Sequence, residues 1–194
     1  MLSCAFFGHR SYDYRPYKDK IREVVEYLIN KGVTEFYNGW RGRFDVICAQ
    51  IVSELKEKYP QIKNIMVLSY RPTKEFELPK YFDESIYLLE DSVPPRYAIA
   101  RTNRALVKKV NYVVSGVAYV WGGAFNACEY AKKLLRSMVN VVTGKSQYFY
   151  EFMSDDEIAK LIEEYKEEAD ALYLRIKDEV ETSIVEHAKK RNKK

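Results

Sequence analysis

Short apolar runs alternate along the chain with segments in which apolar residues recur every three or four positions. The runs are "LSCAFF", "EFYN", "NIMVLS", "SIYLLE", "YVVSG" and "MVNVV", at residues 2–7, 35–38, 64–69, 85–90, 112–116 and 138–142. Continuous apolar character over this length predicts strands that are buried on both faces. Because buried strands that alternate with helices form parallel sheets, the pattern predicts an α/β fold with a Rossmann-like, doubly wound, mainly parallel sheet.

Three of the intervening segments have one apolar helical face each. These faces consist of Ile21, Val24, Val25 and Leu28, then Phe44, Ile47, Ile51 and Leu55, then Ala127, Tyr130, Ala131, Leu134 and Leu135. Residues at this spacing lie on one side of a helix, and we expect them to pack on the sheet. A further helix is expected over residues 98–109, and an irregular connection over residues 70–79, where "YRPTKEFELP" breaks the alternation.

The pattern changes from Ser154 onward. Ser154 and Glu157 fit a capping box, and apolar residues then recur at helical spacing, namely Ile158, Leu161, Tyr165, Leu172, Ile176 and Val180. This stretch predicts one long amphipathic helix, or two with a short break, whose apolar face packs on the body or on a second subunit. We therefore expect a Rossmann-like domain over residues 1–153, a helical extension over residues 154–194, and a homodimer.

Composition and cysteine spacing narrow the class of protein. The 194 residues are 47% hydrophobic and 31% charged, as in globular domains. No apolar run approaches the ~20 residues of a membrane span and no signal peptide is recognisable, so we expect a cytoplasmic protein without membrane contact. Cys4, Cys48 and Cys128 form no CxxC pair, so we expect them to be buried and expect neither a metal site nor a disulfide framework.

The net charge of +4 is unevenly distributed along the chain. Residues 1–153 contain 23 Lys and Arg against 16 Asp and Glu, whereas residues 154–194 contain 9 against 12. Anionic ligands are therefore expected to be drawn to the first of these two parts.

Three glycine-containing loops follow predicted strands and should meet at one edge of the sheet. They are Gly8-His9-Arg10, "NGWRGRFD" at residues 38–45 and "WGGAFNACEYA" at residues 121–131. Ligands of open parallel sheets bind beyond the carboxyl ends of the strands. Glycines let backbone amides approach a phosphate, a following helix offers its free N–H groups, and arginines pair with phosphate oxygens. The loops therefore predict a phosphate site formed by Gly122 and Gly123, with Arg10, Arg41 and Arg43 as further donors.

Two familiar phosphate motifs are excluded by their spacing. "TGKS" at residues 143–146 resembles the end of a P-loop, but the first glycine of that motif would fall at Val139. No GxGxxG follows the first predicted strand, so ordinary dinucleotide oxidoreductase chemistry is disfavoured and no cofactor is expected.

The same loops carry a family resemblance. "CAFFGHR" resembles the opening "aFTGHR" of the YpsA-like family of the SLOG superfamily, and "NGWRGRFDVICAQ" resembles its "sGgAxGvDxxaAE". "NRALVKKVNYVVSGVAYVWGGAFNACEYA" resembles its "RNRxMVdxSdxliAvydGxxGGTxxxxxYA", so the likeness covers residues 2–142. The resemblance implies a Rossmann-like domain that binds a nucleotide or a nucleotide-derived small molecule.

The resemblance marks ligand-binding residues position by position. They are Gly8, His9, Arg10, Gly39, Asp45, Asn103, Arg104, Gly122 and Gly123. Gly42 is added from the loop itself, because Arg43 stands where the family has its second loop glycine. His9 is expected to hold the Arg10 loop, to contact ligand or to act in acid–base chemistry, and Asp45 is expected to cap its helix or to bind a ribose hydroxyl.

A related branch of the superfamily, the lonely-guy phosphoribohydrolases, suggests a catalytic candidate. Counted from Gly122, Glu129 falls at the glutamate of that branch's "GGxGTxxE" motif, where a carboxylate steadies an oxocarbenium-like centre or activates water. Phe125 stands at the third glycine of the motif, and Asn103 stands at the catalytic arginine. The alternative for Glu129 is a solvated residue in the first turn of a helix.

Three functions compete at this stage. The first is nucleotide binding or sensing, and the second is phosphoribohydrolase activity. The third is nucleic-acid binding, which the resemblance implies because SLOG domains also occur in the DNA-processing protein DprA. The missing motif residues weigh against the hydrolase, and the dispersed Lys and Arg residues weigh against a nucleic-acid surface. The sequence therefore favours a nucleotide-binding protein.

Overall fold

The computed structural model describes residues 1–72, 75–90, 93–147 and 163. The chain divides into two units, Met1–Phe149 and Tyr150–Lys194, and the architecture given below is that of the first. The helix expected from Ser154 onward and the domain boundary expected after residue 153 lie outside the described residues, so both stay predictions.

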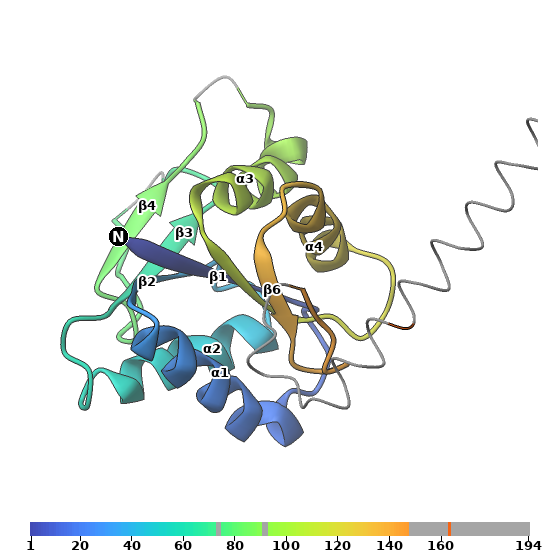
Figure 1. The fold of residues 1–194 in the computed structure, drawn as a ribbon. Helices are drawn as coiled ribbons and strands as arrows, with labels where there is room; N and C mark the ends of the chain where they lie inside the picture. The colour runs from blue at the N-terminus through green and yellow to red at the C-terminus, as the bar shows by residue number, and fades with distance from the viewer. Residues whose placement is uncertain (73–74, 91–92, 148–162, 164–194) are drawn as a thin grey trace, which may run out of the picture. The chain divides into compact units, whose positions relative to one another are not determined.

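A seven-stranded sheet forms the centre of the first unit (Figure 1). In spatial order β4-β3-β2-β1-β5-β6-β7, its strands are β4 (Glu84–Tyr87), β3 (Lys63–Leu68), β2 (Val33–Asn38), β1 (Leu2–Gly8), β5 (Tyr112–Gly116), β6 (Ser137–Asn140) and β7 (Ser146–Gln147). Strands β1 to β6 are parallel to their neighbours, and β7 is antiparallel to β6. This arrangement confirms the predicted Rossmann-like fold. The two-residue strand β7 is too short to leave a pattern in the sequence.

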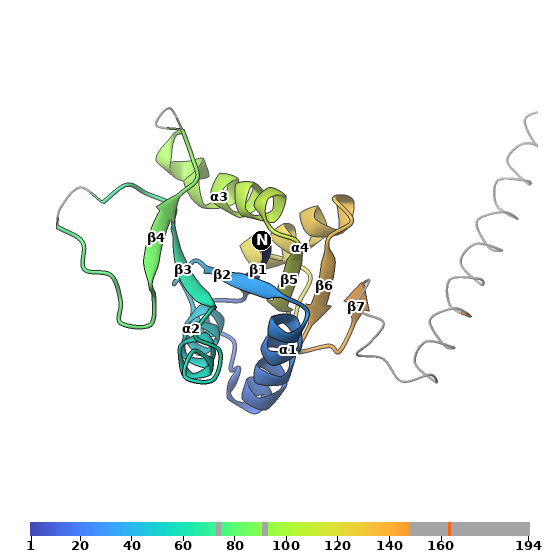
Figure 2. The same ribbon diagram turned by 60° about the vertical axis from the view of Figure 1, so that its left-hand side comes forward.

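Helices cover both faces of the sheet (Figures 1 and 2). α1 (Lys18–Asn30) and α2 (Arg43–Leu55) lie on one face, and α3 (Pro95–Lys109) and α4 (Gly123–Lys133) lie on the other. Successive side chains of a strand point to opposite faces. In β1, Phe7 accordingly packs in the layer of α3 and α4, whereas the ring of Phe6 meets that of Phe44 in α2. The continuous apolar pattern of this strand is explained by burial on both sides.

The third predicted helical face, over residues 127–135, is wrong at its C-terminal end. Ala131 is buried as expected, but α4 ends at Lys133, and Leu134 and Leu135 are 36% and 70% exposed. Leu135 has a left-handed φ of 53°, and the N–H group of Arg136 donates to the Ala131 carbonyl. This Schellman-type ending reverses the chain toward β6, so the helical periodicity stops there.

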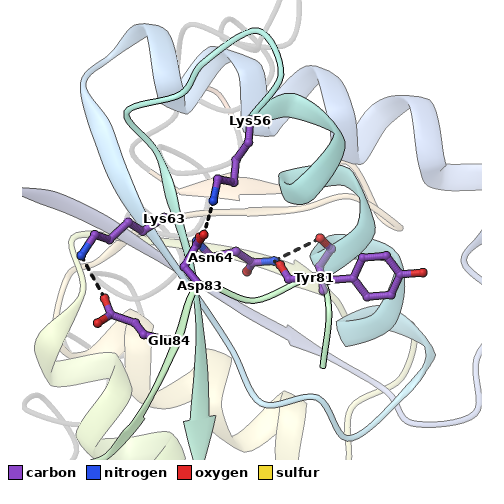
Figure 3. A network of polar contacts seen from close by, with 7 residues as sticks. Lys56, Lys63, Asn64, Tyr81, Asp83 and Glu84 are labelled. Atoms are coloured by element: carbon purple, nitrogen blue, oxygen red, sulfur yellow. Dashed lines mark hydrogen bonds and ion pairs between the residues drawn. The ribbon is translucent and has the colours of Figure 1, made fainter. Parts of the chain in front are cut away.

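The edge strand β4 is held at its start by polar contacts (Figure 3). The side-chain amide of buried Asn64 donates to the carbonyls of Ala49 in α2 and Tyr81 in the preceding connection, at 3.1 and 2.8 Å. The Asp83 carboxylate accepts the N–H group of Asn64 at 2.8 Å. The described residues of the connection 70–79 contain neither helix nor strand, as predicted. Asn64 therefore ties the end of this irregular connection to β3 and α2.

Replacing Asn64 by Ala should lower the free energy of unfolding by about 2 to 4 kcal/mol, because two carbonyl groups in or near the core lose their donor. Urea denaturation measures this difference. As a matched control, Lys63→Ala removes an exposed ion pair with Glu84, 3.3 Å long, and should cost at most about 1 kcal/mol. Equal losses in the two variants would contradict the anchoring role of the amide.

Candidate functional site

The candidate site lies at the carboxyl edge of the sheet, where the strand order reverses. β1 pairs with β2 on one side and with β5 on the other. The chain leaves β1 toward α1 on one face of the sheet and leaves β5 toward α4 on the opposite face. Ligand sites of open parallel sheets form where connections diverge in this way.

A buried tyrosine ties the ends of β1 and β5 together. The Tyr14 hydroxyl accepts the N–H group of His9 at 2.7 Å and donates to the carbonyl of Gly116 at 2.5 Å. Its ring packs on Phe44 of α2, with ring centroids 4.7 Å apart. A Cβ atom on Gly8 would lie 2.3 Å from the Phe44 Cβ atom, so the glycine lets α2 approach the end of β1. The predicted ligand residue Gly8 thus serves helix packing.

The loops after β1 and β2 touch each other directly. A Cβ atom on Gly42 would lie 2.7 Å from the Cα atom of Arg10, closer than real Cβ contacts allow. The N–H group of Arg43, the first residue of α2, donates to the Arg10 carbonyl at 3.0 Å. Gly42, inferred from the loop itself, is therefore the residue that permits the two loops to meet.

These two loops enclose a cavity of about 720 Å³, a size typical of small-molecule sites. The charged residues of its lining are Arg10, Arg15, Arg41, Arg43 and Asp13. The Arg15 guanidinium donates to both carboxylate oxygens of Asp13, at 2.9 and 2.8 Å, and this contact lowers the pKa of Asp13 to about 2. Within the described residues, Arg10 and Arg43 form no ion pair. The cavity therefore carries unmatched positive charge.

A buried carboxylate shapes the loop that precedes α2. Asp45 accepts the N–H group of Arg41 at 2.6 Å, while Asn38 accepts the N–H group of Trp40 and donates to the Asp45 carbonyl, at 2.7 and 2.6 Å. Burial raises the pKa of Asp45 to about 6, against the opposing effects of the Arg41 N–H group and guanidinium. The side chain of Asp45 thus holds the backbone of the loop just before α2, and a ribose-binding role stays a prediction. Gly39 lies beside it, since a Cβ atom there would be 3.5 Å from Asp45 Oδ2.

The Arg41 side chain links this loop to the opposite helical layer. Its guanidinium donates to the Ser69 hydroxyl at the end of β3, and Ser69 donates to the hydroxyl of Thr102 in α3 at 3.0 Å. Ser69 and Thr102 are both buried. This short chain of hydrogen bonds fixes the position of the Arg41 guanidinium in the cavity wall.

The predicted residues on α3 and α4 lie together but do not line the cavity. A Cβ atom on Gly123 would be 3.9 Å from the Asn103 side-chain nitrogen, and the Arg104 guanidinium lies 5.7 Å from the centre of the Tyr130 ring. Gly122 begins α4 with a φ of 93°. The third loop meets the first through the contact of Tyr119 with His9, but none of its residues is among those that line the cavity, so the expectation that all three loops enclose this cavity is not met.

Glu129 is the predicted catalytic residue. Its carboxylate pairs with Lys132 one turn further along α4, at 2.7 Å, and about 40% of its side chain is exposed. This position matches the alternative of a solvated helix residue, and a catalytic role stays a prediction.

His9 holds the loop that follows β1. Its side chain is only 5% exposed, and its Nε2 atom accepts the N–H group of Tyr119 at 3.3 Å. Burial lowers the pKa of His9 from 6.5, so the ring is neutral at pH 7 with its proton on Nδ1. The imidazole ring stacks on the Tyr119 ring, with centroids 3.4 Å apart. Of the three roles expected for His9, the structure therefore shows the first, in which its side chain holds the loop in place.

Several residues of the site escape sequence reasoning. In the sequence, Tyr14, Ser69 and Thr102 look like ordinary core or loop residues. Arg15 lies beyond the first motif of the family resemblance, "CAFFGHR". One signal was available for Tyr14: a tyrosine close behind a glycine-ended strand can place its hydroxyl at the strand end.

Among the described residues, no helix has the length and apolar character needed to cross a membrane. Within the same residues, no group of three or more His, Cys, Asp or Glu side chains is arranged to hold a metal ion. The three cysteines are buried and free, as predicted, and burial raises the pKa of Cys128 to about 11.

Comparison with known proteins gives a likeness in fold. The structure resembles DNA processing protein A (DprA) from Streptococcus pneumoniae, with a TM-score of 0.55 and 16% sequence identity over 72% of this chain and 50% of that one. DprA from Helicobacter pylori, whose single-stranded DNA binding mode has been described, gives a TM-score of 0.49 and 17% identity over 72% of this chain and 64% of that one. The chain thus spans less than two thirds of either protein.

No protein-family model matches the sequence, and no curated protein sequence matches it with statistical significance. The likeness to the S. pneumoniae protein establishes a Rossmann-like fold of the kind found in DprA. Membership of the YpsA-like family stays a prediction.

The raised pKa of Asp45 predicts a pH dependence of stability. A carboxyl group whose pKa rises from 3.8 to about 6 on folding favours the folded state fully below pH 4, and this contribution is lost as the pH rises through 6. The difference in unfolding free energy between the wild type and Asp45→Asn should therefore change by about 3 kcal/mol across this window. Denaturant titrations from pH 3 to pH 8 measure it.

Asp13→Asn is the control for this experiment. Arg15 lowers the pKa of Asp13 in the folded protein, so Asp13 stabilises the fold above pH 4 and the effect is lost as the pH falls toward 2. A flat difference between wild type and Asp45→Asn from pH 4 to pH 6 would show that Asp45 is not buried as described.

Proposed function

We propose that the chain binds a nucleotide or a nucleotide-derived phosphate compound in the cavity between the loops after β1 and β2. The observation that carries the proposal is the charge of the lining, in which four guanidinium groups accompany a single carboxylate, Asp13. Guanidinium groups bind phosphate oxygens in pairs and are the cations best suited to this task.

Other parts of the wall suit the rest of a nucleotide. Val46 and Ile47 of α2 and the indole of Trp40 add apolar surface to the lining. The first turn of α2 also borders the cavity through Gly42 and Arg43, and the N-terminal end of a helix favours a negative charge. The ribose can therefore lie against apolar groups while the phosphate meets the arginines.

Binding rather than hydrolysis is the activity that we propose. Glu129, the carboxylate that a phosphoribohydrolase would use, pairs with Lys132 and is absent from the cavity lining. A DNA processing protein shares this fold, and single-stranded nucleic acid presents the same phosphate groups. An oligonucleotide is therefore included among the test ligands.

The test compares cavity variants by thermal shift and by calorimetric titration with AMP, ADP, ADP-ribose, NAD and a pentamer of deoxyadenylate. A ligand at ~100 times its Kd should stabilise the wild type by roughly 2.7 kcal/mol. The double variant Arg10→Ala/Arg43→Ala should weaken binding by at least about 100-fold, because each charge-assisted hydrogen bond is worth about 1.5 to 3 kcal/mol.

Two controls separate specific contacts from overall charge. Lys108→Ala removes one positive charge from the last turn of α3 and should leave the affinity unchanged. Lys133→Ala removes one positive charge from the last turn of α4, and the double variant Lys108→Ala/Lys133→Ala matches the charge lost in Arg10→Ala/Arg43→Ala but should also leave the affinity unchanged. Unchanged binding in the Arg10/Arg43 variant, or no response of the wild type to any of these ligands, would contradict the proposal.

A further inference from the structure

Three aromatic rings form a stack where the loops after β1 and β5 meet. The ring of Tyr119 lies between those of His9 and Trp121, with centroid distances of 3.4 Å to His9 and 4.3 Å to Trp121. The corresponding interplanar angles are 12° and 27°, so the rings are close to parallel. Residues far apart in the sequence thus build one continuous aromatic column.

The stack is fixed at its inner end and open at its outer end. His9 is buried, and its backbone N–H group is bound by the Tyr14 hydroxyl. The Tyr119 N–H group donates to the His9 ring, which locks the second ring onto the first. Trp121, the outermost ring, is 66% exposed. An indole held in this way loses little conformational freedom when a flat ligand group stacks on it.

The charge next to the stack restricts the kind of ligand. Arg10 follows His9 directly in the chain and lines the arginine cavity. An aromatic stack that begins at His9 and a guanidinium cluster that begins at the next residue, Arg10, together suit a molecule with a planar ring and a phosphate, and nucleotides combine the two. An apolar protein segment would use the indole but would leave the arginines without a partner.

We propose that the exposed face of Trp121 stacks an unpaired nucleobase of the phosphate ligand, so that the aromatic column is the base-binding part of the site. This inference rests on the function proposed above. It assigns the phosphate to the arginine cavity and the base to the aromatic column. Stacking of one base on an aromatic side chain changes affinity by about 5- to 150-fold on substitution by Ala.

The experiment compares AMP with ribose 5-phosphate, which has the same phosphate and sugar but no base. Calorimetric titration of the wild type should show AMP binding at least about fivefold more tightly than ribose 5-phosphate. Trp121→Ala should abolish this difference and leave the affinity for ribose 5-phosphate unchanged. Trp121→Phe should restore most of the difference, and Val120→Ala, at the exposed neighbouring position, should not alter it.

Fluorescence provides an independent measurement, because the chain contains two tryptophans, Trp40 and Trp121. In the variant Trp40→Phe, AMP should quench the fluorescence of Trp121, and ribose 5-phosphate should not. A pentamer of deoxyadenylate forms a third arm. If it binds far more tightly than AMP and depends on Trp121, the base comes from single-stranded nucleic acid, and if it binds no better, the ligand is a free nucleotide.

The outcomes distinguish the two proposals. If ribose 5-phosphate binds in an Arg10- and Arg43-dependent manner but AMP binds no more tightly, the stacking proposal is overturned and the cavity stands. If the base preference is present but persists in Trp121→Ala, the base binds elsewhere and the assignment to Trp121 fails. If no ligand binds to the wild type, both proposals fail.

Discussion

The hydroxyl group of Tyr14 forms the contact on which the candidate site depends. Strands β1 and β5 are paired as far as Gly8 and Gly116, and just beyond them the N–H group of His9 donates to the Gly116 carbonyl over a long 3.4 Å. One buried hydroxyl serves both, because it accepts from His9 and donates to Gly116. Burial raises the pKa of Tyr14, so the donor proton is retained at every physiological pH.

The contacts of Tyr14 and Gly8 with Phe44 hold like-charged side chains close together although these side chains repel each other. The Tyr14 ring and Gly8 bring Phe44 against the sheet, and this places the start of α2 beside Arg10. Arginines from two loops then share one cavity, in which a backbone hydrogen bond joins Arg43 to Arg10 and an ion pair joins Arg15 to Asp13. Clustered like charges destabilise a folded protein, and an anion that neutralises them recovers that free energy on binding.

Two consecutive residues serve two different features of the site. His9 is the inner ring of the aromatic column, whereas Arg10 belongs to the arginine cavity. The column is built with the loop that leads to α4, and the cavity is built with the loop that leads to α2. Because strand order reverses at β1, its end is the place where both loops reach neighbouring residues. The aromatic column and the arginine cavity therefore begin at consecutive residues of the chain.

The sequence by itself determined the parallel sheet, its helical layers and the edge of the sheet at which the loops of the candidate site lie. Buried strands and helical faces leave periodic patterns, and the carboxyl ends of parallel strands share one edge whatever the details of the loops. The charge of the cavity was also foreseeable, since Arg10, Arg41 and Arg43 lie in two of the glycine loops. Gly122 and Gly123 were expected to join them, but only the tertiary structure decided which loops meet. Which loops meet depends on close contacts that leave no local pattern in the sequence, such as Gly42 against Arg10 and Phe44 against Gly8. It also depends on the face of the sheet toward which each connection leaves its strand.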